Sequence, residues 1–148
     1  MSGWRLEDAD VSDVPVLARI IGDWVKETDW MPVLHSREED EGFVAGLLRT
    51  HVVRVARRGA DRLGFLARQG GKVQAIHVLK AARGMGIGRA LLDEVKAIET
   101  EVSLWTFQAN TRAIAFYRRE GFAEADRTDG QCNDERLPDI RMIWGRGL

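Results

Sequence analysis

The sequence contains few cysteines and prolines and no long apolar run. Among its 148 residues there is one cysteine, Cys132, and there are three prolines. A single cysteine excludes an intramolecular disulfide and a cysteine-rich zinc site, so we interpret Cys132 as incidental. No apolar stretch approaches the ~20 residues that cross a bilayer. The N-terminal residues 1–13 carry several acids, whereas a secretory signal has a basic end and an apolar run. We therefore expect a cytoplasmic protein with no metal site and no membrane partner.

The chain also lacks an excess of charge of either sign. It has 22 Lys and Arg against 23 Asp and Glu, for a formal net charge of −1. This balance gives no electrostatic reason to expect a nucleic-acid partner. Apolar residues make up 45% and charged residues 30%, which is typical of a globular chain. The length fits a single domain over residues 1–148, with roughly 70% of the unfolded surface buried on folding.

Hydrophobic spacing predicts a strand and two helices in the first third. Residues 4–6 form the strand, and Asp10 or Ser12 caps the helix that follows. The apolar face of that helix is predicted to be Val14, Leu17, Ile21, Trp24 and Val25. After a loop over residues 26–35, a capping box from Ser36 to Glu39 starts the second helix. Its inward residues are predicted to be Phe43, Val44, Leu47 and Leu48.

The middle of the chain reads as an antiparallel meander. Three strand-like runs occupy residues 51–57, 62–69 and 73–79, separated by glycine-containing turns at residues 59–61 and 70–71. The period then changes to that of a helix, whose apolar positions are Ile87, Leu91, Val95 and Ile98.

The last third predicts alternating elements. Residues 102–108 are apolar on both faces, as in a central strand. Asn110 caps a helix that runs to Glu120 and ends at Gly121, and two closing strands cover residues 122–126 and 139–144. The order is β-α-α-β-β-β-α-β-α-β-β. It predicts an α/β (α+β) fold with a mixed sheet and helices on both faces.

A glycine-rich segment is the most informative part of the sequence. Gly84, Gly86 and Gly88 lie between a strand and an amphipathic helix. Glycine allows a positive φ and a close approach of a ligand to the backbone, and the first amides of a helix favour a phosphate. Arg83 and Arg89 add positive charge. The segment predicts a phosphate or pyrophosphate site, with a tight turn as the alternative.

Two common phosphate motifs do not fit this segment. A P-loop needs Gly-Lys-Ser/Thr, but Arg89 and Ala90 follow the last glycine. A dinucleotide fingerprint needs Gly-x-Gly-x-x-Gly, whose third glycine would fall on Arg89 or Leu91.

Two blocks of the sequence resemble one family. Arg83-Gly-Met-Gly86-Ile-Gly88 resembles Arg/Gln-x-x-Gly-x-Gly/Ala, the acetyl-CoA pyrophosphate signature of the GNAT family (GCN5-related N-acetyltransferases). The run from Asn110 to Phe122 is similar to the family's Asn-x-x-Ala-x-x-Phe-Tyr-x-x-x-Gly-Phe. The element order is also similar to the family's over essentially the whole chain. Lys80 stands where the family usually has a proline, which leaves the exit of the preceding strand open.

The resemblance implies acetyl-CoA as cosubstrate and assigns residues to it. The backbone of one strand would pair with the pantetheine arm, the start of a helix would hold the pyrophosphate, and two side chains would line the far side of the cofactor. The residues implied are, in that order, Ile76, His77 and Val78; Arg83, Gly84, Met85, Gly86, Ile87, Gly88 and Arg89; Asn110 and Phe116.

The implied reaction is direct attack of a neutral amine on the thioester. A backbone amide of the strand over residues 73–79 would stabilise the oxyanion. Tyr117, the only tyrosine, would lie near the sulfur and protonate the thiolate or donate a hydrogen bond to it. The alternative is a core residue, because Tyr117 lies one turn from Ala113 on an apolar face.

The acceptor and a base remain open at this level. The acceptor is predicted to be a small amine or a protein amino group. Base candidates are Glu27, Asp29, His35 and His77, but solvated or structural roles explain each of them as well, so no base is assigned.

Other aromatic residues and the overall activity also have alternatives. Trp30, Met31 and Pro32 either shape the acceptor pocket or simply pack their loop, whereas Trp4, Trp24 and Trp144 are predicted to be core. The alternatives to an acetyltransferase are an acyl-CoA-sensing module without catalysis and a transferase of longer acyl groups. Homodimer formation is left open.

Overall fold

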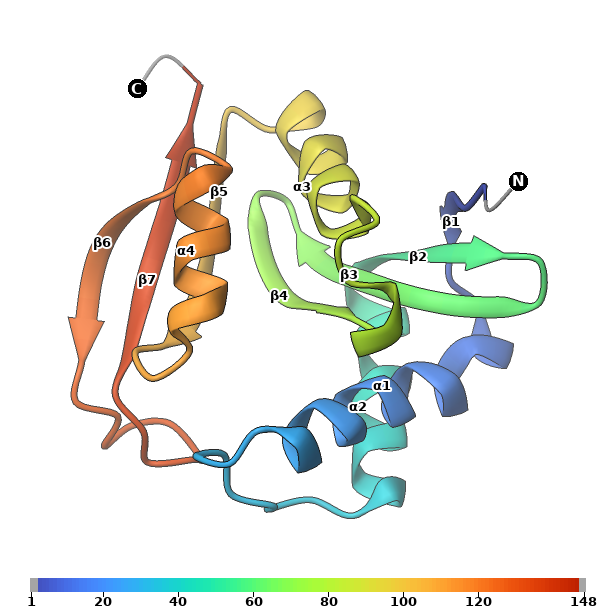
Figure 1. The fold of residues 1–148 in the computed structure, drawn as a ribbon, viewed down its shortest axis with the longest axis horizontal. Helices are drawn as coiled ribbons and strands as arrows, with labels where there is room; N and C mark the ends of the chain where they lie inside the picture. Colours follow the sequence, from blue (N-terminus) through green and yellow to red (C-terminus); the bar gives the residue numbers. More distant parts are fainter. Residues whose placement is uncertain (1–2, 147–148) are drawn as a thin grey trace.

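The structure is a computed structural model that describes residues 3–146, and its centre is a seven-stranded sheet (Figure 1). The strand order is β1-β2-β3-β4-β5-β7-β6. The strands are β1 (Arg5–Asp8), β2 (Val52–Arg58), β3 (Asp61–Gln69), β4 (Lys72–Val78), β5 (Glu101–Phe107), β6 (Ala123–Thr128) and β7 (Asp139–Gly145). The α-helices are α1 (Val14–Glu27), α2 (Arg37–Thr50), α3 (Ile87–Ile98) and α4 (Thr111–Arg119), with 3-10 turns η1 (Val11–Asp13) and η2 (Lys80–Ala82).

The sheet consists of two antiparallel halves joined by one short parallel contact. Strands β2 to β4 form the predicted meander, β1 extends it by pairing with β2, and β5, β7 and β6 form the second half. The halves meet where Lys72 pairs with Ser103 and Val73 with Leu104. The predicted mixed α/β fold and its element order are confirmed. Because β4 and β5 pair only over this short stretch, a cleft opens between them further along the strands.

Helices cover both faces of the sheet, as predicted. Helices α1 and α2 pack on β2 and β3, while α3 and α4 pack on the opposite face (Figure 1). Two predicted core residues are exposed instead: Phe43 at 46% and Ile98 at 64%. Phe43 faces the cleft rather than the core, and Ile98 is the last residue of α3, beyond its buried stripe.

Two strands differ from their sequence-based description. Strand β5 was predicted to be apolar on both faces, but only Val102, Leu104 and Thr106 are buried, whereas Trp105 is 51% exposed. The α1–α2 layer packs on β2 and β3 and does not include β5, so that face stays open. Strand β6 starts at Ala123 rather than at Phe122, which packs in the core. It is the last strand of the sheet and is exposed throughout.

A buried ion cluster fastens the start of α1 to the sheet. Asp10, not Ser12, is the cap, and it caps η1 rather than α1. The carboxylate of the next acid, Asp13, is fully buried and accepts hydrogen bonds from Arg57 (2.6 Å to each oxygen) and from Arg62 Nε (2.8 Å). Burial raises the pKa of Asp13, but these hydrogen bonds outweigh it and lower the pKa to about 2.

Between residues 3 and 146, no helix combines the length and apolarity needed to cross a membrane. Over the same residues, no group of three or more His, Cys, Asp and Glu side chains could hold a metal ion.

Candidate active site

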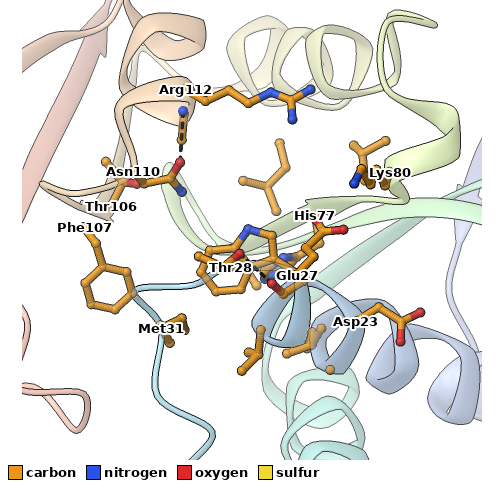
Figure 2. Close-up of a pocket in the computed structure, with 18 of the residues that line it drawn as sticks. Asp23, Glu27, Thr28, Met31, His77, Lys80, Thr106, Phe107, Asn110 and Arg112 are labelled. Atoms are coloured by element: carbon orange, nitrogen blue, oxygen red, sulfur yellow. Dashed lines mark hydrogen bonds between the residues drawn. The ribbon is translucent and has the colours of Figure 1, made fainter.

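The two halves of the sheet diverge beyond their short parallel contact and leave a cleft. After Val73, strand β4 has no partner on its β5 side within the described residues. The cleft has a volume of about 1920 Å³, more than the ~300–1,000 Å³ of ordinary ligand sites. It is lined from α1 and the loop that follows it, the first turns of α2, β4, the glycine segment, β5, α4 and the β6–β7 loop. Figure 2 shows part of this lining. Such a space has room for an elongated cofactor and a second substrate.

The predicted pantetheine strand borders this cleft. Ile76, His77 and Val78 all line it, and each pairs with β3 on the opposite edge. Because buried backbone N–H and C=O groups need partners, the free edge of β4 can pair with an extended, amide-containing ligand.

The glycine segment forms an open turn beside the cleft. Gly84 has φ +86° and Gly86 φ +84°, a conformation that L side chains rarely adopt. Apart from the glycine and its immediate neighbours in the chain, no atom of the described residues lies within 4 Å of the position that a Cβ would take at either glycine. Gly86 is the N-cap of α3 and receives the first helical hydrogen bond from Ala90. The amides of residues 87–89 therefore lack helical partners and can bind an anion.

The side chains in this segment do not all face the cleft. Met85 packs against the core, and Ile87 is only 1% exposed. Only their main-chain groups are available to a ligand. Arg89 lines the cleft with a side chain that is 72% exposed, and its Nε lies 3.7 Å from Glu120.

Arg83 connects the glycine segment to α1. Its guanidinium forms an ion pair with Glu27, the last residue of α1, and both side chains are 24% exposed. Glu27 is therefore not the solvated carboxylate that the sequence suggested. The sequence left open how the chain leaves β4 at Lys80. In the structure, the 3-10 turn η2, which contains Lys80, leads from β4 into the glycine segment.

Helix α4 contributes the opposite wall. Asn110 caps it, because its Oδ1 accepts a hydrogen bond from the Ala113 amide (3.2 Å, Figure 2). Within residues 3–146, its Nδ2 has no hydrogen-bond partner and can donate to a ligand. Phe116 and Tyr117 also line the cleft, with their ring centres 5.4 Å apart. The cap, the ring and the hydroxyl thus lie on one side of the same space.

Tyr117 is a packed residue that also borders the cleft. Its ring is 8% exposed and packs between Phe116 and Phe122 (5.4 and 5.8 Å between ring centres). It nevertheless lines the cleft. Burial raises the pKa of Tyr117 above its usual value near 10, so the phenol keeps its proton at neutral pH and can donate a hydrogen bond.

Sequence reasoning missed three basic residues of the cleft. Lys80, Arg112 and Arg119 line it, and Figure 2 shows Arg112 reaching over the open space. Arg112 and Arg119 are seven residues apart with Phe116 between them, which places all three on one helical face. That spacing was a usable signal. Because Arg83 and Arg89 lie beside Glu27 and Glu120, the net positive charge of this half of the cleft comes from Lys80, Arg112 and Arg119.

Four aromatic side chains form a row on the other side of the cleft. The ring centres of His77 and Trp24 are 5.5 Å apart, those of Trp24 and Trp30 6.0 Å, and those of Trp30 and Phe107 5.8 Å. The row runs from β4 through α1 and its loop to β5. Trp24 was predicted to be core, but it is half-buried and lines the cleft, because α1 ends at the gap between the sheet halves.

The base candidates have different surroundings. Burial, with a smaller effect of the nearby Arg83 charge, lowers the pKa of His77 to about 4. A neutral imidazole with that pKa is a poor acceptor for the proton of an alkylammonium. Asp29 and His35 line the cleft, and His35 Nδ1 lies 3.8 Å from Glu39.

Comparisons with known proteins agree with this geometry. Residues 39–124 match the model of an acetyltransferase (GNAT) domain. The peptidyl-lysine N-acetyltransferase YjaB of Escherichia coli K12 is 28% identical over 109 residues, which are 73% of this chain and 74% of the relative.

Two solved structures share the fold. The solution structure of apo-form YjaB from Escherichia coli has a TM-score of 0.81 at 21% identity, covering 98% of this chain and 99% of that chain. The structure of yncA from Salmonella typhimurium with its cofactor acetyl-CoA has a TM-score of 0.74 at 17% identity, covering 99% and 96%.

Proposed function

Since the chain belongs to the GNAT acetyltransferase family, we propose that residues 1–148 act as one domain that transfers an acetyl group from acetyl-CoA to a primary amine. The observation that carries this proposal is the open turn of Gly84 and Gly86 at the start of α3, placed directly beside the gap between β4 and β5. It offers an anion site next to an unpaired strand edge, which are the two features that a phosphate-bearing, amide-containing cofactor requires.

Coenzyme A fits the two halves of this arrangement. Its pyrophosphate would accept hydrogen bonds from the free amides that begin α3, and its pantetheine amides would pair with the edge of Ile76, His77 and Val78. The cluster of Lys80, Arg112 and Arg119 would attract the phosphates electrostatically. Asn110 and Phe116 would bound the far side. The thioester would then lie in the gap, near Tyr117.

The transfer itself needs no covalent enzyme intermediate. The nitrogen lone pair of a neutral amine attacks the thioester carbon, the new C–N bond forms and the C–S bond breaks. The nitrogen loses one proton and the departing thiolate gains one, so that the products are an amide and free CoA thiol. An N–H of β4 would stabilise the oxyanion. With no base assigned, the incoming ammonium loses its proton to solvent.

Tyr117 would act mainly as a hydrogen-bond donor to the leaving sulfur. A thiol has a pKa of about 8.5 and an ordinary phenol one of about 10. Full proton transfer from the phenol to the thiolate is therefore uphill by about 2 kcal/mol. The raised pKa of the buried Tyr117 makes full transfer less favourable still. A hydrogen bond to the developing negative charge stabilises the same transition state without that cost.

The acceptor is proposed to be an alkyl primary amine. The E. coli relative is named as a peptidyl-lysine N-acetyltransferase, and a lysine side chain is such an amine. A small free amine is the alternative.

The proposal is tested by combining binding with turnover. Acetyl-CoA, propionyl-CoA and succinyl-CoA are titrated into the protein by calorimetry, and thiol release is measured colorimetrically with a panel of peptidyl-lysine and small amines. Tight acetyl-CoA binding with amine-dependent thiol release supports the proposal. Binding without thiol release from any amine would instead indicate a sensing module. Tighter binding and faster turnover of a longer acyl-CoA would indicate that the protein transfers that longer acyl group rather than acetyl. If no CoA ester bound, the proposed function would be overturned.

Replacing Tyr117 by Phe should separate chemistry from binding. Phenylalanine keeps the ring packed between Phe116 and Phe122 but removes the hydroxyl. Because a hydrogen bond to a charged group contributes ~1.5–3 kcal/mol, kcat should fall about 10- to 100-fold. The Kd for acetyl-CoA should change by less than about twofold, because ground-state contacts remain. Steady-state kinetics and calorimetry check both values, and an unchanged kcat would remove Tyr117 from the mechanism.

A further inference from the structure

An ion pair lies next to the open glycine turn. Arg83 directly precedes Gly84, and its Nη2 donates a hydrogen bond to Oε1 of Glu27, the last residue of α1. Both side chains are largely buried. Within residues 3–146, this is the only hydrogen bond that the Arg83 side chain makes. The positive charge beside the turn is therefore neutralised by a carboxylate of the protein itself.

Glu27 depends on this pairing more than a surface carboxylate would. It lies at the C-terminal end of α1, where the helix dipole is negative and favours a cation over an anion. In the part of the chain that the structure describes, Arg83 is the one residue with which Glu27 forms an ion pair. An anion from outside that draws Arg83 away thus leaves Glu27 without its partner, and the two anions act against each other.

The pair has space on both sides. Arg83 and Glu27 line the main cleft and also a smaller cavity of about 460 Å³ between α1 and η2. Lys26 lines that smaller cavity too. Arg83 can therefore turn into the cleft and Glu27 toward Lys26 by rotation of their side chains, a motion that takes picoseconds to nanoseconds at exposed positions.

Electrostatic repulsion decides between sharing Arg83 and competing for it. If a guanidinium held a carboxylate and a phosphate at once, the two anions would lie about 6 Å apart. At an effective dielectric constant of ~20, such charges repel each other enough to raise Kd about 100-fold. In return, Glu27 would hold the guanidinium in one orientation, but the whole rotamer entropy of an arginine corresponds to only about 30-fold. Competition outweighs this gain from ordering.

We infer that Glu27 and the pyrophosphate of coenzyme A compete for Arg83, and that Glu27 thereby lowers the affinity for acetyl-CoA and for the product CoA alike. This inference rests on the proposed function and adds a residue that sets the cofactor affinity. Glu27 acts through Arg83 and is a positioning residue, not a catalytic one. Because affinity differences of this kind lie mostly in the dissociation rate, the competition favours release of CoA after each transfer.

The competition is tested with Glu27→Gln, and Asp23→Asn is its matched control. Asp23 lies one turn earlier on the same helix (Figure 2) and lines both cavities, but within residues 3–146 it forms no ion pair with Arg83. In calorimetry, Glu27→Gln should bind acetyl-CoA and CoA about 10-fold more tightly, since a hydrogen bond to a charged group is worth about 10-fold or more. Asp23→Asn, which changes the net charge equally, should alter Kd by less than about twofold. Unchanged or weaker binding in Glu27→Gln, or an equal gain in Asp23→Asn, would overturn the inference.

Two further measurements test whether Glu27 acts through Arg83 on the pyrophosphate. In an Arg83→Gln background, adding Glu27→Gln should change Kd by less than about twofold, because no guanidinium is left to compete for. KM for S-acetylpantetheine, a donor without the pyrophosphate, should be the same in Glu27→Gln and in the original protein. A full 10-fold gain without Arg83, or a changed KM or kcat with the truncated donor, would overturn the inference.

These outcomes are distinct from failure of the proposed function. If the inference alone were wrong, the original protein would still bind acetyl-CoA and release thiol with an amine, but Glu27→Gln would not bind the cofactor more tightly. If the proposed function were wrong, the original protein would bind no CoA ester. Thermal unfolding of each variant shows that the compared proteins are folded.

Discussion

Replacing Asp13 by Ala is expected to lower the free energy of unfolding by about 3–5 kcal/mol. The fully buried carboxylate holds Arg57 and Arg62 at 2.6 to 2.8 Å. Removing one partner of a buried ion pair leaves the other charge uncompensated, which is costlier than losing the attraction alone. Domains of this size are stable by only ~5–15 kcal/mol, so the midpoint of thermal unfolding should fall by roughly 10 °C. Denaturant titration and a thermal scan measure this.

A matched exposed ion pair provides the control. Asp126 is 55% exposed and lies 2.7 Å from Arg141 Nε. Asp126→Ala should cost less than ~1 kcal/mol, because exposed pairs contribute little. Losses of similar size in the two variants would show that burial does not set the energy of the Asp13 cluster.

The same cluster predicts how stability depends on pH. Because the folded-state pKa of Asp13 is about 2, below the ordinary value of 3.8, the folded protein binds its proton less readily than the unfolded chain. The resulting contribution, about 2 kcal/mol, is fully present above pH ~4 and is lost as the pH falls toward 2. In Asp13→Asn this part of the pH dependence should disappear. The free energy of unfolding of both proteins is measured by denaturant titration at several pH values from 2 to 5. If it changed with pH to the same extent in both proteins, the Asp13 carboxylate would not titrate as described.

Replacing Gly86 by Asp is expected to weaken acetyl-CoA binding about 100-fold or more. Gly86 has φ +84° and open space where a Cβ would point, so the new carboxylate would lie beside the proposed pyrophosphate position. Two unit charges ~5 Å apart at an effective dielectric constant of ~20 repel each other by about 3 kcal/mol, which corresponds to about two orders of magnitude in Kd. Calorimetry with acetyl-CoA measures the change.

Gly86→Asn separates charge from shape. Asparagine and aspartate have nearly the same volume, and both tolerate a positive φ better than other side chains. The two unliganded variants should therefore unfold at similar temperatures, and Gly86→Asn should bind acetyl-CoA much more tightly than Gly86→Asp. An equal loss in both would mean that space, not charge, matters at this position. Undiminished binding in Gly86→Asp would contradict the proposed pyrophosphate site.

Local sequence signals anticipated many features of the fold. The Ser36 capping box, the Asn110 cap and the glycine segment each depend on residues within a few positions of one another. A helix start or a turn forms from such neighbours wherever the segment is placed. The element order followed from the hydrophobic period, and the two family blocks, both local patterns, indicated the chemistry.

The features that were missed join distant parts of the chain. Asp13 meets its arginines across 44 and 49 residues, and Arg83 meets Glu27 across 56. Trp24 was assigned to the core because the apolar spacing of its helix is the same whether that face packs on a sheet or borders a cleft. The gap between β4 and β5, which Trp24 borders, cannot be located from a local sequence pattern.

The sequence alone was therefore enough for the elements, their order and the glycine turn at the start of α3, because backbone conformation responds to neighbouring residues. Folding in three dimensions settled which side chains share the cleft. Strands β4 and β5 stay together only at Lys72–Ser103 and Val73–Leu104, and where they part, residues from four separate segments form one aromatic wall. Which strands pair, and where the pairing stops, depends on long-range packing that no short stretch of sequence encodes.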